Sequence, residues 1–157
     1  MAYADLVNRF SATRVGGWLA RQTAARLDPW VYRRTGGRFT STGTPTIPQI
    51  TLITTGRKTG KRREVHLAAL ADGDDFVVVA SNFGQEHHPA WMYNLQAEPR
   101  AQVRAGKDLL DVTAQVVTGP EKDELWPRLH EIVPQFDVYR DRTDRDIQIF
   151  RLRRDRP

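Results

Sequence analysis

Residues 64–81 read EVHLAALADGDDFVVVAS, and this stretch decides the class of fold. Two apolar runs, 64–71 and 75–81, flank a short segment of Asp and Gly, which is typical of a tight turn between antiparallel strands. Both runs have the length of a strand, and the second is rich in valine. The stretch therefore predicts a β-hairpin, from which the rest of the chain can be assigned outward.

The same pattern recurs on both sides of this hairpin. Short apolar or β-branched runs bounded by turn residues predict further strands at 50–55, 101–106, 109–117 and 146–153. AGKD at 105–108 predicts a second turn, and the segments 89–98 and 119–133, each opening at a proline, predict helices. Antiparallel hairpins interrupted by single helices favour an α+β protein built on a closed or half-closed barrel over a doubly wound parallel sheet.

Residues 1–40 have a different character. Apolar residues at three- and four-residue steps, with arginines between them, predict an amphipathic helix within 3–35. Two interpretations stay open: the helix packs on the core of the protein, or it rests on an anionic membrane surface. We expect an N-terminal helical segment, 1–40, attached to a barrel, 41–157, in what is overall a single domain.

Composition narrows the chemistry. The 157 residues include 24 Lys and Arg against 19 Asp and Glu, and no cysteine. Disulfides, thiolate catalysis and Cys-ligated metal centres are therefore excluded. The four histidines lack the paired spacing of metal ligands, so no metal site is expected. The absence of a signal-peptide core and of an apolar run of about 20 residues favours a cytoplasmic protein.

The excess positive charge is concentrated in one loop. Residues 54–65 read TTGRKTGKRREV and carry five cations between 57 and 63, a number equal to the net charge of the chain. The loop lacks the spacing of a nucleotide-hydrolase phosphate loop, and it has no aromatic residue on which nucleic-acid bases could stack, so no nucleic-acid partner is expected. Arginine forks, threonine hydroxyls and backbone N–H groups beside glycine suit one compact polyanionic ligand. A solvated turn is the plainer alternative.

Four motifs follow one another in order: TTGRKTGKRREVHL, VVVASNFGQEHHPAWMYNL, EPRAQV and ELWPRL…TDRDI. From about Ile50 to Leu152 the sequence resembles the deazaflavin-dependent nitroreductase family, actinobacterial enzymes that use coenzyme F420. The resemblance implies a split β-barrel of mainly antiparallel strands with flanking helices. It also implies an F420H2-dependent reductase that passes a hydride from the reduced deazaflavin to an activated double bond, a quinone or a nitro-type acceptor.

By the same resemblance, the basic loop binds the anionic tail of F420 through Arg57, Lys58, Thr59 and Arg63. Further cofactor-binding residues are expected on the next strand, after the strand at 75–81 and on the short helix: Glu64, Val65, His66, Leu67, Ala68, Val79, Ala80, Ser81, Asn82, Ala90, Trp91 and Asn94. The substrate pocket is expected at Val133, Phe136 and Tyr139. Ser81 and Tyr139 are the candidate catalytic residues, the first as a hydrogen-bond donor and the second, as an alternative to water, as the proton donor.

The sequence departs from the family pattern in two places. Asn82 stands where many relatives have lysine, which removes one possible anion contact. Only Tyr139 retains a phenol in the expected pocket, which argues against the nitroimidazole-activating activity of some members. Two other functions stay open: an F420-binding carrier without turnover, and a split-barrel reductase that binds FMN. The expected partner is a small-molecule acceptor, and membrane contact through residues 1–35 would give the cytoplasmic protein a peripheral membrane association.

Overall fold

The computed structural model describes residues 27, 30, 31, 34 and 47–156. The chain divides into two compact units, Met1–Thr46 and Ile47–Pro157. In the first unit the four described residues are helical, and the Arg34 guanidinium carbon lies 5.3 Å from the centre of the Trp30 ring. The rest of the helix predicted within 3–35 lies outside the described residues, and the boundary between 40 and 41 stays a prediction.

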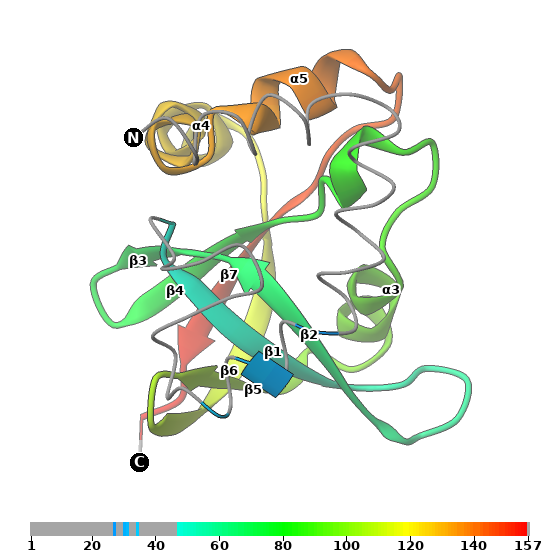
Figure 1. The fold of residues 1–157 in the computed structure, drawn as a ribbon, viewed down its shortest axis with the longest axis vertical. Coiled ribbons are helices and arrows are strands. Elements are labelled where there is room, and N and C mark those ends of the chain that lie inside the picture. Colours follow the sequence, from blue (N-terminus) through cyan, green and yellow to red (C-terminus); the bar gives the residue numbers. More distant parts are fainter. Residues whose placement is uncertain (1–26, 28–29, 32–33, 35–46, 157) are drawn as a thin grey trace. The chain divides into compact units, whose positions relative to one another are not determined.

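One antiparallel sheet of seven strands organises residues 47–156 (Figure 1). The strands are β1 (Gln49–Thr55), β2 (Arg62–Ala68), β3 (Leu70–Asp72), β4 (Asp75–Val79), β5 (Arg100–Ala105), β6 (Asp108–Val117) and β7 (Ile149–Arg154). Their order across the sheet is β2-β1-β5-β6-β7-β4-β3, and all neighbours pair antiparallel. Gly73 and Gly106, with φ of +63° and +60°, make the two predicted turns. The predicted antiparallel α+β barrel is therefore confirmed.

One continuous segment supplies both edges of this sheet. Only Ala69 separates β2 from β3, yet these strands stand at opposite ends of the strand order. Ala69 is buried, and its N–H donates to the Pro48 carbonyl at 3.0 Å. The single strand predicted over 64–71 is thus two strands that meet at a bend. Because the chain leaves one edge and begins the other at this bend, the sheet curls into a half-closed barrel.

Three α-helices and a short 3-10 turn accompany the sheet within 47–156. α3 (Ala90–Ala97) and α4 (Pro120–Ile132) correspond to the two predicted helices, and η1 (Asn82–Gly84) follows β4. The sequence did not predict α5 (Gln135–Asp141), because it is short and Pro134 interrupts the helical pattern just before it. Figure 1 shows α4 and α5 at one end of the sheet and α3 on the side toward which the β1–β2 hairpin extends.

The core consists of two apolar clusters. The first packs α3 on the sheet, with the Trp91 ring edge-on to that of Phe150 and 5.7 Å between centroids. The second packs α4 and α5 on the other part of the sheet, around residues such as Leu129. Val65, before the bend, packs on the first cluster, and Leu70, after it, packs on the second. The chain bends at Ala69 because the segment on either side of it packs on a different cluster.

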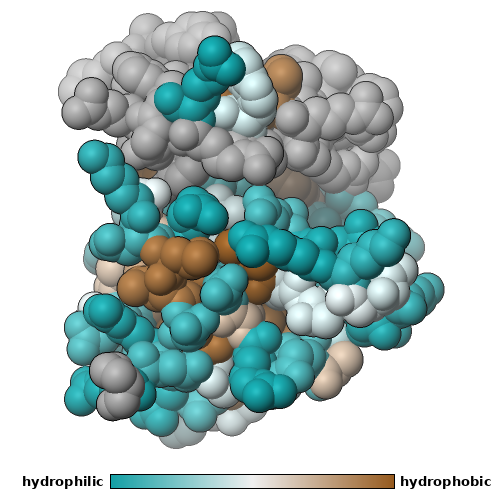
Figure 2. Space-filling model, turned by 90° about the horizontal axis from the view of Figure 1, so that it is seen from below, coloured by the Kyte–Doolittle hydropathy of each residue, from teal (hydrophilic) through white to brown (hydrophobic). Residues whose placement is uncertain are grey.

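The surface has limited apolar exposure. Figure 2 shows one face of the molecule, where apolar residues gather inside a hydrophilic surround. Exposed apolar side chains of residues 47–156 include Leu109 and Val116 on β6 and Phe83 in η1. In the described part of the chain, no helix combines the length and apolar character needed to cross a membrane. Of the exposed residues, Phe83 lies next to residues predicted for the site.

Candidate functional site

The basic loop joins β1 to β2 as a closed turn. The Gly56 N–H donates to the Lys61 carbonyl, and the Gly60 N–H donates to the Gly56 carbonyl, both at 2.7 Å. Gly60 has a φ of +65°, a conformation that glycine adopts without steric cost. A Cβ on Gly56 would lie 2.9 Å from the Thr59 hydroxyl and 3.1 Å from the Lys61 carbonyl. Both glycines are therefore required by the shape of the turn.

A buried side chain of α3 anchors this loop. The Asn94 Oδ1 accepts a hydrogen bond from the Arg57 N–H at 3.0 Å, and the Asn94 Nδ2 donates to the Thr54 hydroxyl at 3.1 Å. Asn94 and Thr54 are 7% and 3% exposed, so an unpaired polar group here would be costly. The Arg57 guanidinium also lies 4.8 Å from the centre of the Tyr93 ring, a cation–π contact. The loop is thus attached to α3 through its backbone and its first arginine.

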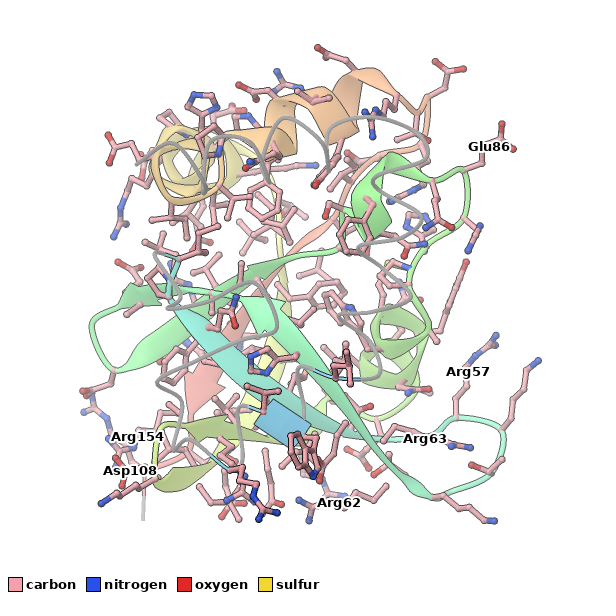
Figure 3. All side chains as sticks on the ribbon, viewed as in Figure 1. Arg57, Arg62, Arg63, Glu86, Asp108 and Arg154 are labelled. Carbon is pink, nitrogen blue, oxygen red and sulfur yellow. The ribbon has the colours of Figure 1, made fainter. Side chains whose placement is uncertain are left out.

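The five loop cations have few anionic partners. Arg62 forms an ion pair with Glu64 at 3.1 Å, and the Arg63 guanidinium donates a long hydrogen bond to the Thr59 hydroxyl at 3.4 Å. Among the described residues, no carboxylate pairs with the other four cations, which are Arg57, Lys58, Lys61 and Arg63. Figure 3 shows Arg57 on the α3 side of the hairpin and Arg62 on the opposite side. Like charges this close repel one another, so an anion bound at the loop would relieve the repulsion.

β2 presents its side chains to two faces. Glu64 and His66 share one face, where the His66 ring lies within hydrogen-bonding distance of two β1 side chains, at 2.7 and 3.2 Å. Val65 and Leu67 share the other face and pack on the first apolar cluster, and Ala68 packs on the second. A ligand lying along β2 would therefore meet one of these sets of side chains, but not both.

The chain makes a strained turn directly after β4. Ala80 and Ser81 are 0% and 9% exposed, and the next two residues, Asn82 and Phe83, have φ of +45° and +56°. A positive φ is uncommon outside glycine and is a genuine outlier for a bulky side chain. The Asn82 side chain donates to the His87 carbonyl at 2.9 Å, which closes the turn. Strain of this kind persists only where the surrounding structure enforces it.

Arg145, in the segment before β7, holds this turn in place through hydrogen bonds to its backbone. Its guanidinium donates to the carbonyls of Ala80 at 3.0 Å and Gln85 at 2.7 Å, and also to that of Ser81. The Arg145 Nη1 lies 3.1 Å from the His88 Nδ1, which must be unprotonated because arginine only donates. Burial, and after it the neighbouring Arg145 charge, lowers the pKa of the His88 imidazole. The path of residues 80–88 therefore depends on one distant arginine.

The predicted pocket residues lie in the second apolar cluster, on and just before α5. Val133, Phe136 and Tyr139 are 7%, 6% and 7% exposed. Burial raises the pKa of the Tyr139 phenol, which is neutral at pH 7 even in water, and no described residue hydrogen-bonds it. The Phe83 ring stands edge-on to the Tyr139 ring, with 5.8 Å between centroids. A Cβ on Gly84 would lie 2.7 Å from the Tyr139 carbonyl oxygen, so η1 and α5 pack closely.

The three predicted residues of α3 have different environments. Ala90 is exposed, whereas Trp91 is buried in the first cluster against Phe150. Asn94 uses both ends of its side-chain amide for protein partners. Trp91 therefore stabilises the core by packing, and Asn94 fixes the position of the loop. Of the three residues, only Ala90 is accessible from solvent.

A groove of ≈ 470 Å³ lies beside the loop, and its lining includes Ile53, Arg62, Glu98 and Arg100. Its arginines are already paired, Arg62 with Glu64 and Arg100 with Glu98, both at 3.1 Å. An anion in this groove would compete with these carboxylates. The four cations of the loop that lack such partners are therefore the stronger candidate for an anion site.

Some of the predicted residues are brought together, at two places: the loop with α3 and the end of β4 with α5. Three residues that the sequence analysis did not single out join them: Tyr93 beside Arg57, Phe83 beside Tyr139, and Arg145 behind the β4 turn. The glycine after Phe83 signals a turn but not its direction. Arg145 binds backbone carbonyls 60 to 65 positions away, and no local pattern encodes such a contact.

Comparisons with known proteins identify the family. A family model described as F420H(2)-dependent quinone reductase matches residues 24–153. An F420H(2)-dependent quinone reductase of Mycobacterium tuberculosis is 33% identical over 146 residues, which cover 89% of this chain and 98% of that protein.

Solved structures show the same fold. An F420-H2 dependent reductase is 35% identical with a TM-score of 0.63, and the match covers 67% of this chain and 93% of that one. A heme storage protein from Vibrio cholerae is similar in fold alone, with 14% identity and a TM-score of 0.54, over 84% of this chain and 92% of that one. The split barrel thus carries different ligands in different proteins, and the fold by itself does not select among them.

Proposed function

This chain belongs to the F420H(2)-dependent quinone reductase family, and from that premise we propose which of its residues hold the reduced cofactor and which meet the acceptor. The chain is an F420H2-dependent oxidoreductase, so the family, the cofactor and the class of activity expected from its motifs are confirmed. A small-molecule acceptor of the quinone type is consistent with the family. The assignment of individual residues is the proposal.

The observation that supports the cofactor site is the set of loop cations without carboxylate partners among the described residues. The tail of F420 carries a phosphodiester and several carboxylates, which are the groups that arginine forks and lysine ammonium groups bind. We assign Arg57, Lys58, Thr59 and Arg63 to this tail. Arg62 is a weaker candidate because Glu64 already neutralises it. The residues present therefore fit the anionic part of the cofactor.

When bound, reduced F420 supplies a hydride from its deazaflavin ring. The chain's own residues orient that ring, exclude water and hold a proton. We assign Val79, Ala80, Ser81, Asn82 and Ala90 to the ring and its linker, with Trp91 and Asn94 as their support. Residues 64–68 of β2 are proposed to run alongside the cofactor, which meets only one face of this strand. We assign the Tyr139 hydroxyl, which carries its proton at neutral pH as any phenol does, to the role of proton donor to the acceptor.

A fluorescence titration with F420 tests the loop assignment. The double variant Arg57→Ala, Lys58→Ala loses two charged contacts, and we expect its affinity for F420 to fall by roughly ten- to a hundredfold. The control variant Lys107→Ala, Arg153→Ala removes the same charge from exposed positions outside the loop, and we expect a change below about threefold. Equal losses in both variants would show that net charge, and not the loop, attracts the cofactor.

Turnover separates a reductase from a carrier. We expect oxidation of F420H2, followed by its absorbance, to accelerate when menadione is added. A carrier would bind F420 without that acceleration, and an FMN enzyme would bind FMN in preference to F420.

We also propose a cytoplasmic location with peripheral membrane contact through residues 1–35, which the arginine pattern of that segment supports. Co-sedimentation of the full chain with vesicles of anionic and of neutral lipid tests this contact. Sedimentation with anionic vesicles at low salt is the expected result, and no difference between the two lipids would contradict it.

A further inference from the structure

We propose that Phe83 forms one wall of the acceptor site and favours planar aromatic acceptors. The inference rests on the proposed function, because it places hydride transfer beside the end of β4. None of the sequence motifs assigned a role to this residue. It follows from the position, the backbone conformation and the exposure of Phe83.

Phe83 is close in sequence to one candidate catalytic residue and in contact with the other. It stands two positions after Ser81, and its ring contacts that of Tyr139 edge-on, with 5.8 Å between centroids and 69° between the planes. Tyr139 is 7% exposed, whereas Phe83 is 36% exposed. The phenyl ring is therefore the more accessible half of an aromatic pair at the predicted site.

The backbone holds this ring in place at a cost. Phe83 has a φ of +56°, which a glycine would adopt without strain. Two groups of contacts enforce the turn: the Asn82 side chain bonds to the His87 carbonyl, and the Arg145 guanidinium bonds to carbonyls on both sides of the turn. This conformation reduces the stability of the protein in two ways: the backbone is strained, and an apolar ring is exposed to water. Strain of this kind gathers at ligand sites, where it orients a side chain in advance.

The aromatic pair has the chemistry of a quinone site. An aromatic ring packs on another ring in an offset-stacked or edge-on arrangement. The accessible Phe83 ring can take such a contact from a planar acceptor. The Tyr139 hydroxyl, which no described residue hydrogen-bonds, is free to donate to an acceptor carbonyl. A non-aromatic enone offers the same carbonyl but no ring to stack.

The test measures acceptor binding without turnover. Protein saturated with oxidised F420 is titrated by calorimetry with 1,4-naphthoquinone and, separately, with 2-cyclohexenone, so that both ligands are in the oxidised form. We expect Phe83→Ala to weaken naphthoquinone binding by about three- to tenfold, the factor that an aromatic contact contributes. Cyclohexenone binding should fall by less than about twofold. The dissociation constant of F420 should change by less than about twofold.

Two further variants separate contact from folding. Phe83→Tyr keeps the ring and should restore naphthoquinone binding. Phe83→Gly relieves the positive φ and should unfold at a higher temperature than Phe83→Ala, while binding naphthoquinone as weakly. In steady state, Phe83→Ala should raise the KM for naphthoquinone more than it lowers kcat.

The inference is overturned if Phe83→Ala binds naphthoquinone as the wild type does, or if both acceptors and F420 lose affinity equally. The second result would mean that Phe83 only packs on Tyr139. A wild-type protein that fails to bind F420 overturns the proposed function and this inference with it. A wild-type protein that binds F420 and reduces quinone, with an indifferent Phe83→Ala variant, overturns this inference alone.

Discussion

The attachment of the basic loop to α3 yields the sharpest prediction, through the substitution Asn94→Ala. This change removes the hydrogen bonds to the Arg57 N–H and the Thr54 hydroxyl. Each bond contributes about 1 kcal/mol. Leaving the hydroxyl of Thr54, a residue that is 3% exposed, without its partner adds about another 1 kcal/mol. The free energy of unfolding should therefore fall by roughly 2–4 kcal/mol. For a chain of this size, the melting temperature should fall by roughly 5–15 °C.

Thermal denaturation followed by circular dichroism measures this loss. Gln96→Ala is the matched control, because Gln96 lies exposed on the same helix and makes only a long bond, 3.4 Å, to Gln148. Its melting temperature should stay within about 2 °C of the wild type. The affinity for F420 should fall in Asn94→Ala, because binding must then order a loop that is no longer held in place. A melting temperature of Asn94→Ala within about 2 °C of the wild type would refute the reasoning.

Two other substitutions test the β4 turn. Gly84→Ala should destabilise the protein by several kcal/mol in urea denaturation, because its Cβ would lie 2.7 Å from the Tyr139 carbonyl oxygen. The control is Gly73→Ala, in the turn between β3 and β4. Gly73 has no atom within 4 Å of the added Cβ, so this change should cost only about 1 kcal/mol. Burial and the Arg145 charge lower the pKa of His88 in the folded state, so on acidification the unfolded chain takes up this proton first, and stability should decline as pH falls below about 6.5. His88→Gln should flatten the dependence of melting temperature on pH between about 7.5 and 5.5, and an unchanged slope would contradict that origin.

Much of this protein is encoded locally. The hairpin of β3 and β4 and the AGKD turn follow from residues that are neighbours in sequence, since turn chemistry and strand alternation act over a few positions. The cations and glycines of the loop lie within eight residues, 56–63, so the sequence alone predicts an anion site there. The order of the motifs was sufficient to identify the family, and with it the cofactor.

Tertiary structure decided how these parts meet. The bend at Ala69 arises because one segment must serve two apolar clusters and both edges of the sheet. Asn94 reaches the Arg57 backbone across 37 positions, and Arg145 reaches the β4 turn across more than 60. Such contacts depend on strand register and on the closure of the barrel, which no window of sequence contains. The sequence alone identified the cofactor. The packing of distant residues decided the strained backbone that exposes Phe83 beside Tyr139.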